Sequence, residues 1–240
     1  NLPAAARIAI VGISTLLPGA ATLQTYWENI LDKVDAISEI PVERFDWRSY
    51  YDPDKSARDK IYSHWGGFID DVPLNPLDYG MPPNSIPSIE PMQLLMLEAV
   101  RAALQDAGYL DRPFARERTS VTMAVGGGLG DLGFNYGVRS YLPHFLSTGS
   151  QEVIDRLDDA LPEWTEDSFP GILLNVLAGR IANRFDLNGP NLVVDAACGS
   201  SLAALDIAIK DLQTQRTDLA IVGGADTVQS PFGFLAFSKT

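Results

Sequence analysis

The stretch "NLVVDAACGSSLAALDIAIKDLQTQRTDLAIVGG", residues 191–224, decides the fold class. It opens with the apolar run "NLVVDA", continues with a helical pattern from Cys198 to about Leu212, and closes with the apolar run "DLAIVGG". Apolar runs without polar alternation are typical of strands covered on both faces, and a helix between two such runs is typical of a βαβ unit. The stretch therefore predicts an α/β fold with a mainly parallel sheet flanked by helices.

The sequence before this stretch predicts more elements of the same class. The run "RIAIVGIS", residues 7–14, predicts a strand that ends in a turn at Pro18-Gly19, and residues 22–33 predict a helix capped by Thr22. Residues 41–87 are rich in proline, aspartate and aromatic residues, which predicts a long irregular but packed connection.

The clearest helix lies within residues 88–108, with Ser88 as its cap, Pro91 in its first turn and Gly108 at its end. Its apolar face is predicted to consist of Met92, Leu95, Met96, Ala99 and Ala103. After it, "SVTMAV", residues 120–125, predicts a buried strand, and residues 171–186 predict a helical segment.

Composition limits the functional classes. The chain has 240 residues, a hydrophobic content of 46% and a net charge of −13, which fits one large α/β domain or two small ones and argues against sequence-independent nucleic-acid binding. The longest weakly polar stretch, residues 192–209, contains Asp195 and Asp206 and is therefore not a membrane span. A single cysteine cannot form an intrachain disulfide, and we expect a cytoplasmic protein. The acidic residues 152–167 are interpreted as a solvated face.

A glycine-rich motif follows the strand at 120–125. Gly128, Gly130 and Gly133 form G-x-G-x-x-G, the first half of a dinucleotide-binding fingerprint. The second half requires a helix that opens at the third glycine, and the following "FNYGVRSYLPHF" places a glycine and a proline in that helix. We therefore expect a loop near a site or a subunit interface, and no nicotinamide or flavin.

Cys198 is predicted at the start of a helix that follows a strand. Unpaired N–H groups and the helix dipole favour a thiolate there, and the same amides could stabilise an oxyanion. The alternative is a buried packing cysteine, since free cysteine is among the most buried residue types. The small residues after Cys198 predict a helix buried between close-packed layers, with the thiol reached through a tunnel. Ser200 and Ser201 are interpreted as helix-start or packing residues.

The motif "VDAACGSSLAAL" around Cys198 resembles the active-site segment of the β-ketoacyl synthases, the condensing domains of fatty-acid and polyketide synthases. The resemblance covers most of the chain in the family's order, with "IAIVGISTLLPGA", "IEPMQLLMLEAVRAALQDAGY", "LAGRIANRFDLNGPN" and "DLAIVGGAD" matching further segments. The segments "MPPNSIPSIEP" and "EWTEDSFPG" resemble iterative multi-domain synthases of polyunsaturated fatty acids or related polyketides more than typical modular polyketide synthases. Ala196 and Gly199 depart from the commoner threonine and serine, which affects the subtype only.

The resemblance implies that Cys198 is the nucleophile, that the complete fold is thiolase-like with αβαβα layers, and that residues 1–240 form the N-terminal part of the domain. It also implies an acyl carrier protein as partner, acyl and malonyl thioesters carried on phosphopantetheine, no metal or bound redox cofactor, and a homodimer. Arg44, Arg48 or Arg58 could form the basic patch that docks the carrier.

Two histidines assist the cysteine in this family, and neither His64 nor His144 lies in a matching motif. Both are therefore interpreted as surface or packing residues, and the chain is interpreted as a segment of a longer polypeptide without the histidine-bearing half. Such a segment is expected to be acylated slowly and to be unable to condense. The alternatives are a non-catalytic condensing-like half-domain that pairs with a partner and shapes its tunnel, and another thiolase-fold enzyme that uses coenzyme A thioesters.

Overall fold

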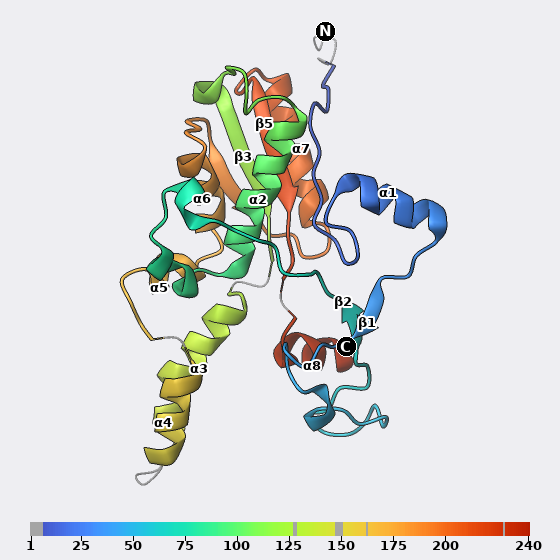
Figure 1. The fold of residues 1–240 in the computed structure, drawn as a ribbon, viewed down its shortest axis with the longest axis vertical. Coiled ribbons are helices and arrows are strands. Elements are labelled where there is room, and N and C mark those ends of the chain that lie inside the picture. Colours follow the sequence, from blue (N-terminus) through green and yellow to red (C-terminus); the bar gives the residue numbers. More distant parts are fainter. Residues whose placement is uncertain (1–6, 127–128, 147–150, 162, 228) are drawn as a thin grey trace. The chain divides into compact units, whose positions relative to one another are not determined.

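The computed structural model describes residues 7–126, 129–146, 151–161, 163–227 and 229–240, which fall into two compact units. The first unit takes its described residues from 1–11 and 74–227, and the second takes them from 12–73 and 228–240. Figure 1 shows the elements of both.

A three-stranded parallel sheet forms the centre of the first unit. Its strands are ordered β4 (Asn191–Val194), β3 (Thr119–Ala124) and β5 (Leu219–Gly224). Ala124 pairs in register with both Val194 and Gly224, so the three carboxyl ends meet at one edge of the sheet. The predicted βαβ unit is confirmed, with β3 inserted between its two strands.

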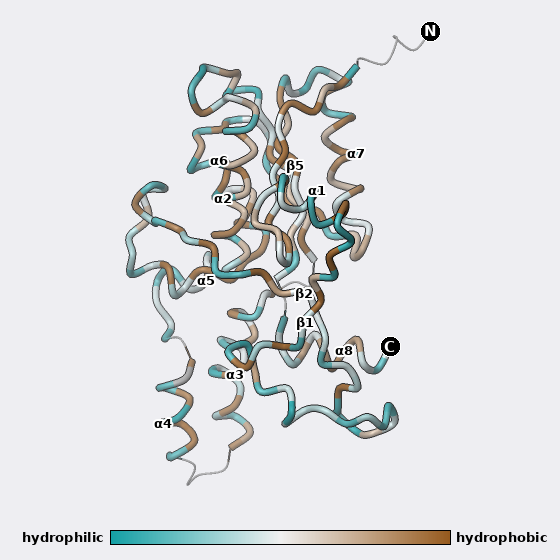
Figure 2. Tube along the Cα trace, turned by 45° about the vertical axis from the view of Figure 1, so that its right-hand side comes forward, coloured by the Kyte–Doolittle hydropathy of each residue, from teal (hydrophilic) through white to brown (hydrophobic). Residues whose placement is uncertain are grey.

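Helices cover both faces of this sheet. Figures 1 and 2 show α2 and α6 on one face and α7 on the other. The helices of the first unit are α2 (Pro91–Asp106), α3 (Asp131–Phe145), α4 (Gln151–Ala160), α5 (Ser168–Ile172), α6 (Val176–Arg184) and α7 (Ser200–Gln213), with 3-10 turns at Pro76–Tyr79, Pro83–Ser88 and Arg116–Arg118.

The core lies mainly between β3 and the α2–α6 layer. Val121 and Met123 are fully buried there, in one cluster with Met92 and Leu177. Side chains of this size contribute about 1.5–3 kcal/mol each when they are buried completely. Every residue of β3 is buried, as the apolar run predicts for a strand covered on both faces.

The helix α7 is buried on one face only. Ala204 and Ala208 are at most 1% exposed, whereas Leu202 is 74% exposed, and Figure 2 shows how much of the helix is hydrophobic. The prediction that α7 is buried between two packed layers is therefore wrong: among the described residues of this unit, the sheet covers one face of α7 and the other face is exposed.

The helix α2 differs from its prediction in its cap and its buried face. Pro91 occupies the first turn and Gly108 follows the helix with φ +70°, as predicted. However, Glu90 is the N-cap residue, and the Ser88 hydroxyl bonds to that of Thr165 at 3.0 Å. The buried residues of α2 are Met92, Gln93, Met96, Leu97, Val100 and Leu104, so the buried face is rotated toward α6.

The predicted strand at 7–14 is not formed: these residues are assigned to none of the strands in the described sheets. Ile10 is 78% exposed and Val11 is 47% exposed. A strand requires a neighbour that accepts and donates its backbone hydrogen bonds, and an apolar run alone does not supply one.

The second unit contains α1 (Leu23–Asp32), the antiparallel strands β1 (Ile37–Glu39) and β2 (Trp65–Gly67), a 3-10 turn at Trp47–Ser49, and α8 (Pro231–Ser238). The Thr22 hydroxyl accepts the N–H of Thr25 at 3.1 Å, which confirms the predicted cap. The rest of this unit is largely irregular, as its proline content predicts. None of the helices within the described ranges is long and apolar enough to cross a membrane.

Candidate active site

Cys198 lies in the tight turn that joins β4 to α7. The strand ends at Val194 and the helix begins at Ser200, so five residues reverse the chain. Within the turn Ala197 has φ +48°, in the left-handed region, a conformation that costs about 1–2 kcal/mol for a residue with a Cβ. The thiol of Cys198 is exposed, so the predicted tunnel is absent from the described structure and the thiol is directly accessible.

Hydrogen bonds hold this turn from both sides. The Asp195 Oδ1 accepts the Ala197 N–H at 3.0 Å, and the Ser200 Oγ accepts the Ala196 N–H at 2.8 Å. The Ser200 hydroxyl donates to the Ala197 carbonyl at 2.6 Å. Ser200 is therefore the first helical residue, as predicted, and it also bonds to the two residues that precede Cys198.

The backbone around the thiol leaves one amide available. The N–H groups of Gly199 and Ser200 donate to the carbonyls of Ala196 and Ala197 at 3.1 Å each. Among the described residues the Cys198 N–H has no acceptor. An unpaired N–H at a helix N-terminus, next to an exposed thiol, can stabilise negative charge on an oxygen that is bound beside the sulfur.

The thiol turn lies at the carboxyl edge of the sheet, where open parallel sheets usually carry their sites. Gly126, which precedes the glycine-rich motif, lies beside it, because a Cβ on Gly126 would be 3.2 Å from Asp195 Oδ1. On the other side, a Cβ on Gly224 would be 2.3 Å from Ser201 Oγ. Glycine at the end of β5 therefore permits the close approach of α7.

The N-terminus of α3, which follows Gly130 of the glycine-rich motif, binds a carboxyl group of the chain itself. A helix, α3, follows the loop, so the prediction that glycine and proline would prevent one is wrong. Pro143 lies near its end, where few hydrogen bonds are lost, and the hydroxyl of Tyr136 bonds to that of Ser168 at 2.8 Å. The Glu90 carboxylate accepts the Leu132 N–H at 3.0 Å at the N-terminus of α3.

This carboxylate lies against the second glycine of the motif. A Cβ on Gly130 would be 2.1 Å from the Glu90 carboxyl carbon, so the side chain fills the place that a phosphate would need. Gly128, the first glycine of the motif, lies outside the described residues. Sequence reasoning missed this role of Glu90, because its position in the chain, 42 residues before Leu132, gives no local signal.

The two histidines lie in packing or surface positions, as predicted. His64 stacks on the ring of Trp47 at 4.1 Å, and its Nε2 lies 3.6 Å from Glu39 Oε1. His144 is exposed on α3 next to Phe145. His64 belongs to the second unit and Cys198 to the first.

The three arginines predicted to dock a carrier differ in their contacts. Arg48 lies 3.3 Å from Asp46 and over the ring of Trp47, and Arg58 lies 3.1 Å from Asp59. Arg44 is exposed. All three belong to the second unit.

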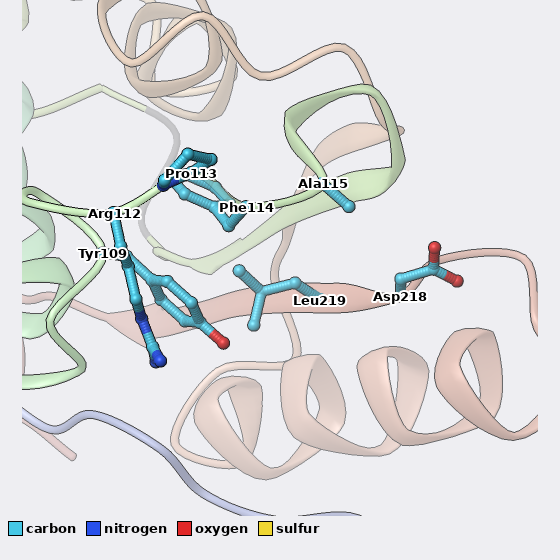
Figure 3. Close-up of a pocket in the computed structure, with 7 residues that line it drawn as sticks. All are labelled: Tyr109, Arg112, Pro113, Phe114, Ala115, Asp218 and Leu219. Atoms are coloured by element: carbon cyan, nitrogen blue, oxygen red, sulfur yellow. The ribbon is translucent and has the colours of Figure 1, made fainter.

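A separate pocket of about 260 Å³ lies at the opposite end of the sheet (Figure 3). Leu219, the first residue of β5, lines it together with Tyr109, Arg112, Pro113, Phe114, Ala115 and Asp218. The Asp218 carboxylate is engaged by Arg118 in two bonds of 2.8 and 3.0 Å. The pocket is thus remote from the thiol turn. No group of metal-binding side chains occurs within the described part of the chain.

Three comparisons give the relationships of the chain. Residues 5–240 match the family model for the β-ketoacyl synthase N-terminal domain. One of the polyunsaturated fatty acid synthase subunits of Thraustochytrium sp. (strain ATCC 26185 / S-3) is 35% identical over 98% of this chain and 9% of that protein.

Two solved structures share the fold. A ketosynthase from module 6 of the bacillaene synthase from Bacillus subtilis 168 superposes with a TM-score of 0.74 at 26% identity, over 96% of this chain and 34% of that one. An oxazolomycin ketosynthase domain from Streptomyces albus JA3453 gives a TM-score of 0.73 at 28% identity, over 96% and 36%. The chain therefore spans about a third of each of these structures, and its α/β architecture is that of the thiolase-like ketosynthases.

Proposed function

The chain belongs to the β-ketoacyl synthase family, and from this premise we propose that Cys198 accepts an acyl group from a carrier-protein thioester for a decarboxylative condensation. The observation that carries the proposal is the exposed thiol in the β4–α7 turn, next to the Cys198 N–H, which has no acceptor in the part of the chain that the structure describes. We also propose that the chain is part of an acyltransferase of polyketide or fatty-acid synthesis.

The acylation step uses both groups of Cys198. The thiolate attacks the thioester carbonyl, a new C–S bond forms, and the carbonyl oxygen becomes an oxyanion facing the Cys198 N–H. When the oxyanion collapses, the C–S bond to the carrier breaks and the carrier leaves as a thiolate that takes up a proton. The acyl group remains on Cys198.

The condensation step completes the turnover. Decarboxylation of a malonyl-carrier thioester releases CO₂ and leaves a carbanion, which attacks the acyl-cysteine. A C–C bond forms, the C–S bond to Cys198 breaks, and a β-ketoacyl thioester leaves on the carrier. We assign the two histidines of this step to sequence outside residues 1–240, because His64 and His144 match neither family motif.

The partners and the setting follow from the same proposal. The acyl chains are carried on phosphopantetheine of an acyl carrier protein, the condensation itself needs no metal or redox cofactor, and the complete domain is a homodimer in the cytoplasm. The 240 residues alone are acylated but do not condense.

The proposal is tested by separating its two steps. The chain is incubated with an acyl-carrier thioester, alone and with its native downstream sequence attached, and a malonyl-carrier thioester is then added. We expect acylation in both forms and β-ketoacyl product in the extended form only. β-Ketoacyl product from the 240 residues alone would contradict the proposal that this part of the domain is acylated but does not condense. A preference for free coenzyme A thioesters would favour a different thiolase-fold enzyme.

A further inference from the structure

The peptide unit between Ala197 and Cys198 carries two groups that matter for acyl transfer. Its carbonyl belongs to Ala197 and its N–H to Cys198. Because the peptide is planar and trans, these two groups point in opposite directions. Whatever fixes the direction of the Ala197 carbonyl therefore also fixes the direction of the Cys198 N–H.

The Ala197 carbonyl is fixed by a single residue. It accepts the Ser200 hydroxyl at 2.6 Å and the Ser200 N–H at 3.1 Å. A carbonyl oxygen has two lone pairs, so these two bonds use its full capacity. The same hydroxyl accepts the Ala196 N–H at 2.8 Å, and Ser200 is 6% exposed, which excludes most competing water.

We propose that Ser200 is a positioning residue for acyl transfer: its hydroxyl holds Ala197 in the left-handed conformation and so aims the Cys198 N–H at the oxyanion. This inference rests on the proposed role of Cys198 as acyl acceptor. Asp195 supports the same conformation from the other side, through the bond from the Ala197 N–H at 3.0 Å. Loss of the Ser200 hydroxyl allows Ala197 to relax to negative φ, and the peptide plane rotates with it.

The neighbouring serine offers a matched control. Ser201 is exposed and lies toward Gly224, and its hydroxyl makes no bond to residues 195–198. Ser200→Ala and Ser201→Ala therefore remove the same atom from adjacent positions, and only the first affects the turn. Ser200→Thr retains the hydroxyl.

The test compares two reactions of the same thiol. Acylation by an acyl-carrier thioester passes through an oxyanion, whereas alkylation by iodoacetamide does not. We expect Ser200→Ala to lower the acylation rate constant at least about tenfold, as losses of oxyanion donors do, and to change the alkylation rate constant less than about twofold. Ser201→Ala is expected to leave both rates unchanged, and Ser200→Thr to restore most of the acylation rate.

Several results would overturn the inference. A parallel fall of both rates in Ser200→Ala shows a structural role only, and an unchanged acylation rate shows no role. If Ser200→Ala does not fold, the exposed Asp195→Ala decides, because it removes the other bond to Ala197: an unchanged ratio of acylation to alkylation contradicts the inference. A wild-type chain that is alkylated at Cys198 but never acylated overturns the proposed function as well.

Discussion

Glu90 carries a carboxyl group into the interior of the first unit, where it is 1% exposed. Burial raises the pKa of Glu90 above its usual range, the charge of Asp131 acts in the same direction, and the Leu132 N–H opposes both. Between the ordinary and the raised pKa, the folded chain holds a proton at Glu90 that the unfolded chain has lost. The contribution of Glu90 to the free energy of unfolding therefore falls as the pH rises through this window.

A neutral side chain at position 90 removes this dependence. We expect the free energy of unfolding of Glu90→Gln to fall less than that of the wild type as the pH rises above the ordinary pKa of a glutamate, measured by urea denaturation. The exposed Glu43→Gln serves as control and should follow the wild type. Curves of Glu90→Gln and the wild type that remain parallel would contradict this account of Glu90.

Gln93 is the other polar residue buried in α2, and it joins three segments. Its Nε2 donates to the carbonyls of Gly171 at 2.7 Å and Leu173 at 3.0 Å, and its Oε1 accepts the Arg180 Nε at 2.7 Å. Burial lowers the pKa of the Arg180 guanidinium, and the charge of Arg184 acts in the same direction.

Removal of the Gln93 amide leaves the Arg180 Nε without its acceptor, whereas the carbonyls of Gly171 and Leu173 keep the N–H groups of Glu90 and Val176. We expect Gln93→Leu to lower the free energy of unfolding by about 1–3 kcal/mol, the cost of one buried group left unsatisfied. Gln105→Leu, on the exposed side of α2, should stay within about 0.5 kcal/mol of the wild type. Equal effects of the two changes in urea denaturation would refute the assignment.

The two serines at positions 200 and 201 have different roles that the sequence alone does not predict. The motif predicts a thiol at the first position of a helix, whereas the structure places Cys198 in the turn before it, two residues ahead of the first helical residue Ser200. Ser200 and Ser201 are the same residue type at adjacent positions, so the sequence does not distinguish their roles. Only the left-handed Ala197 directs its carbonyl to Ser200, so the role of that hydroxyl could not be predicted.

At the scale of the element, α3 offers a test with two glycines in different surroundings. Gly130 is the N-cap, and a Cβ there would be 2.1 Å from the Glu90 carboxyl carbon. Gly137 lies inside the helix, and a Cβ there would meet no atom within 4 Å.

The two alanine substitutions should therefore have opposite effects. We expect Gly130→Ala to destabilise the chain by about 1–3 kcal/mol, because Glu90 must move. We expect Gly137→Ala to stabilise it by up to about 1 kcal/mol, because alanine is the better helix former. Thermal or urea unfolding of both variants measures these two changes in stability. Destabilisation by Gly137→Ala without destabilisation by Gly130→Ala would contradict the prediction.

The elements also show where sequence patterns suffice. β3, β5 and α1 follow from apolar runs and a local cap, because the signal and its cause lie in the same few residues. The run at 7–14 has the same apolar character, yet it forms no strand, because its partner is a property of the whole sheet. α3 forms in spite of Gly137 and Pro143, because Ser168 and Glu90 bind it from distant segments.

At the scale of the whole molecule, the first unit contains Cys198 and the parallel sheet, and the second contains most of the irregular connection. The α/β class, the parallel sheet and the place of Cys198 could be predicted from the sequence. The insertion of β3 between β4 and β5 could not, because a βαβ pattern does not state whether its two strands are neighbours.

The net charge of −13 sets one condition on the proposed docking of a carrier protein. A chain with this charge repels an acidic carrier protein at long range, so the two must recognise each other through local contacts. Salt weakens this binding only where the contacts use a basic patch. The chemistry at Cys198 does not depend on this condition, since acylation can also be followed with small thioesters.

The central claim is that Cys198 accepts the acyl group, and the most direct measurement is peptide mass mapping after incubation with an acyl thioester. The account predicts one acyl adduct per chain, located on the peptide that contains Cys198, and no adduct in Cys198→Ala. An adduct on another residue, or equal labelling of the wild type and Cys198→Ala, would contradict it.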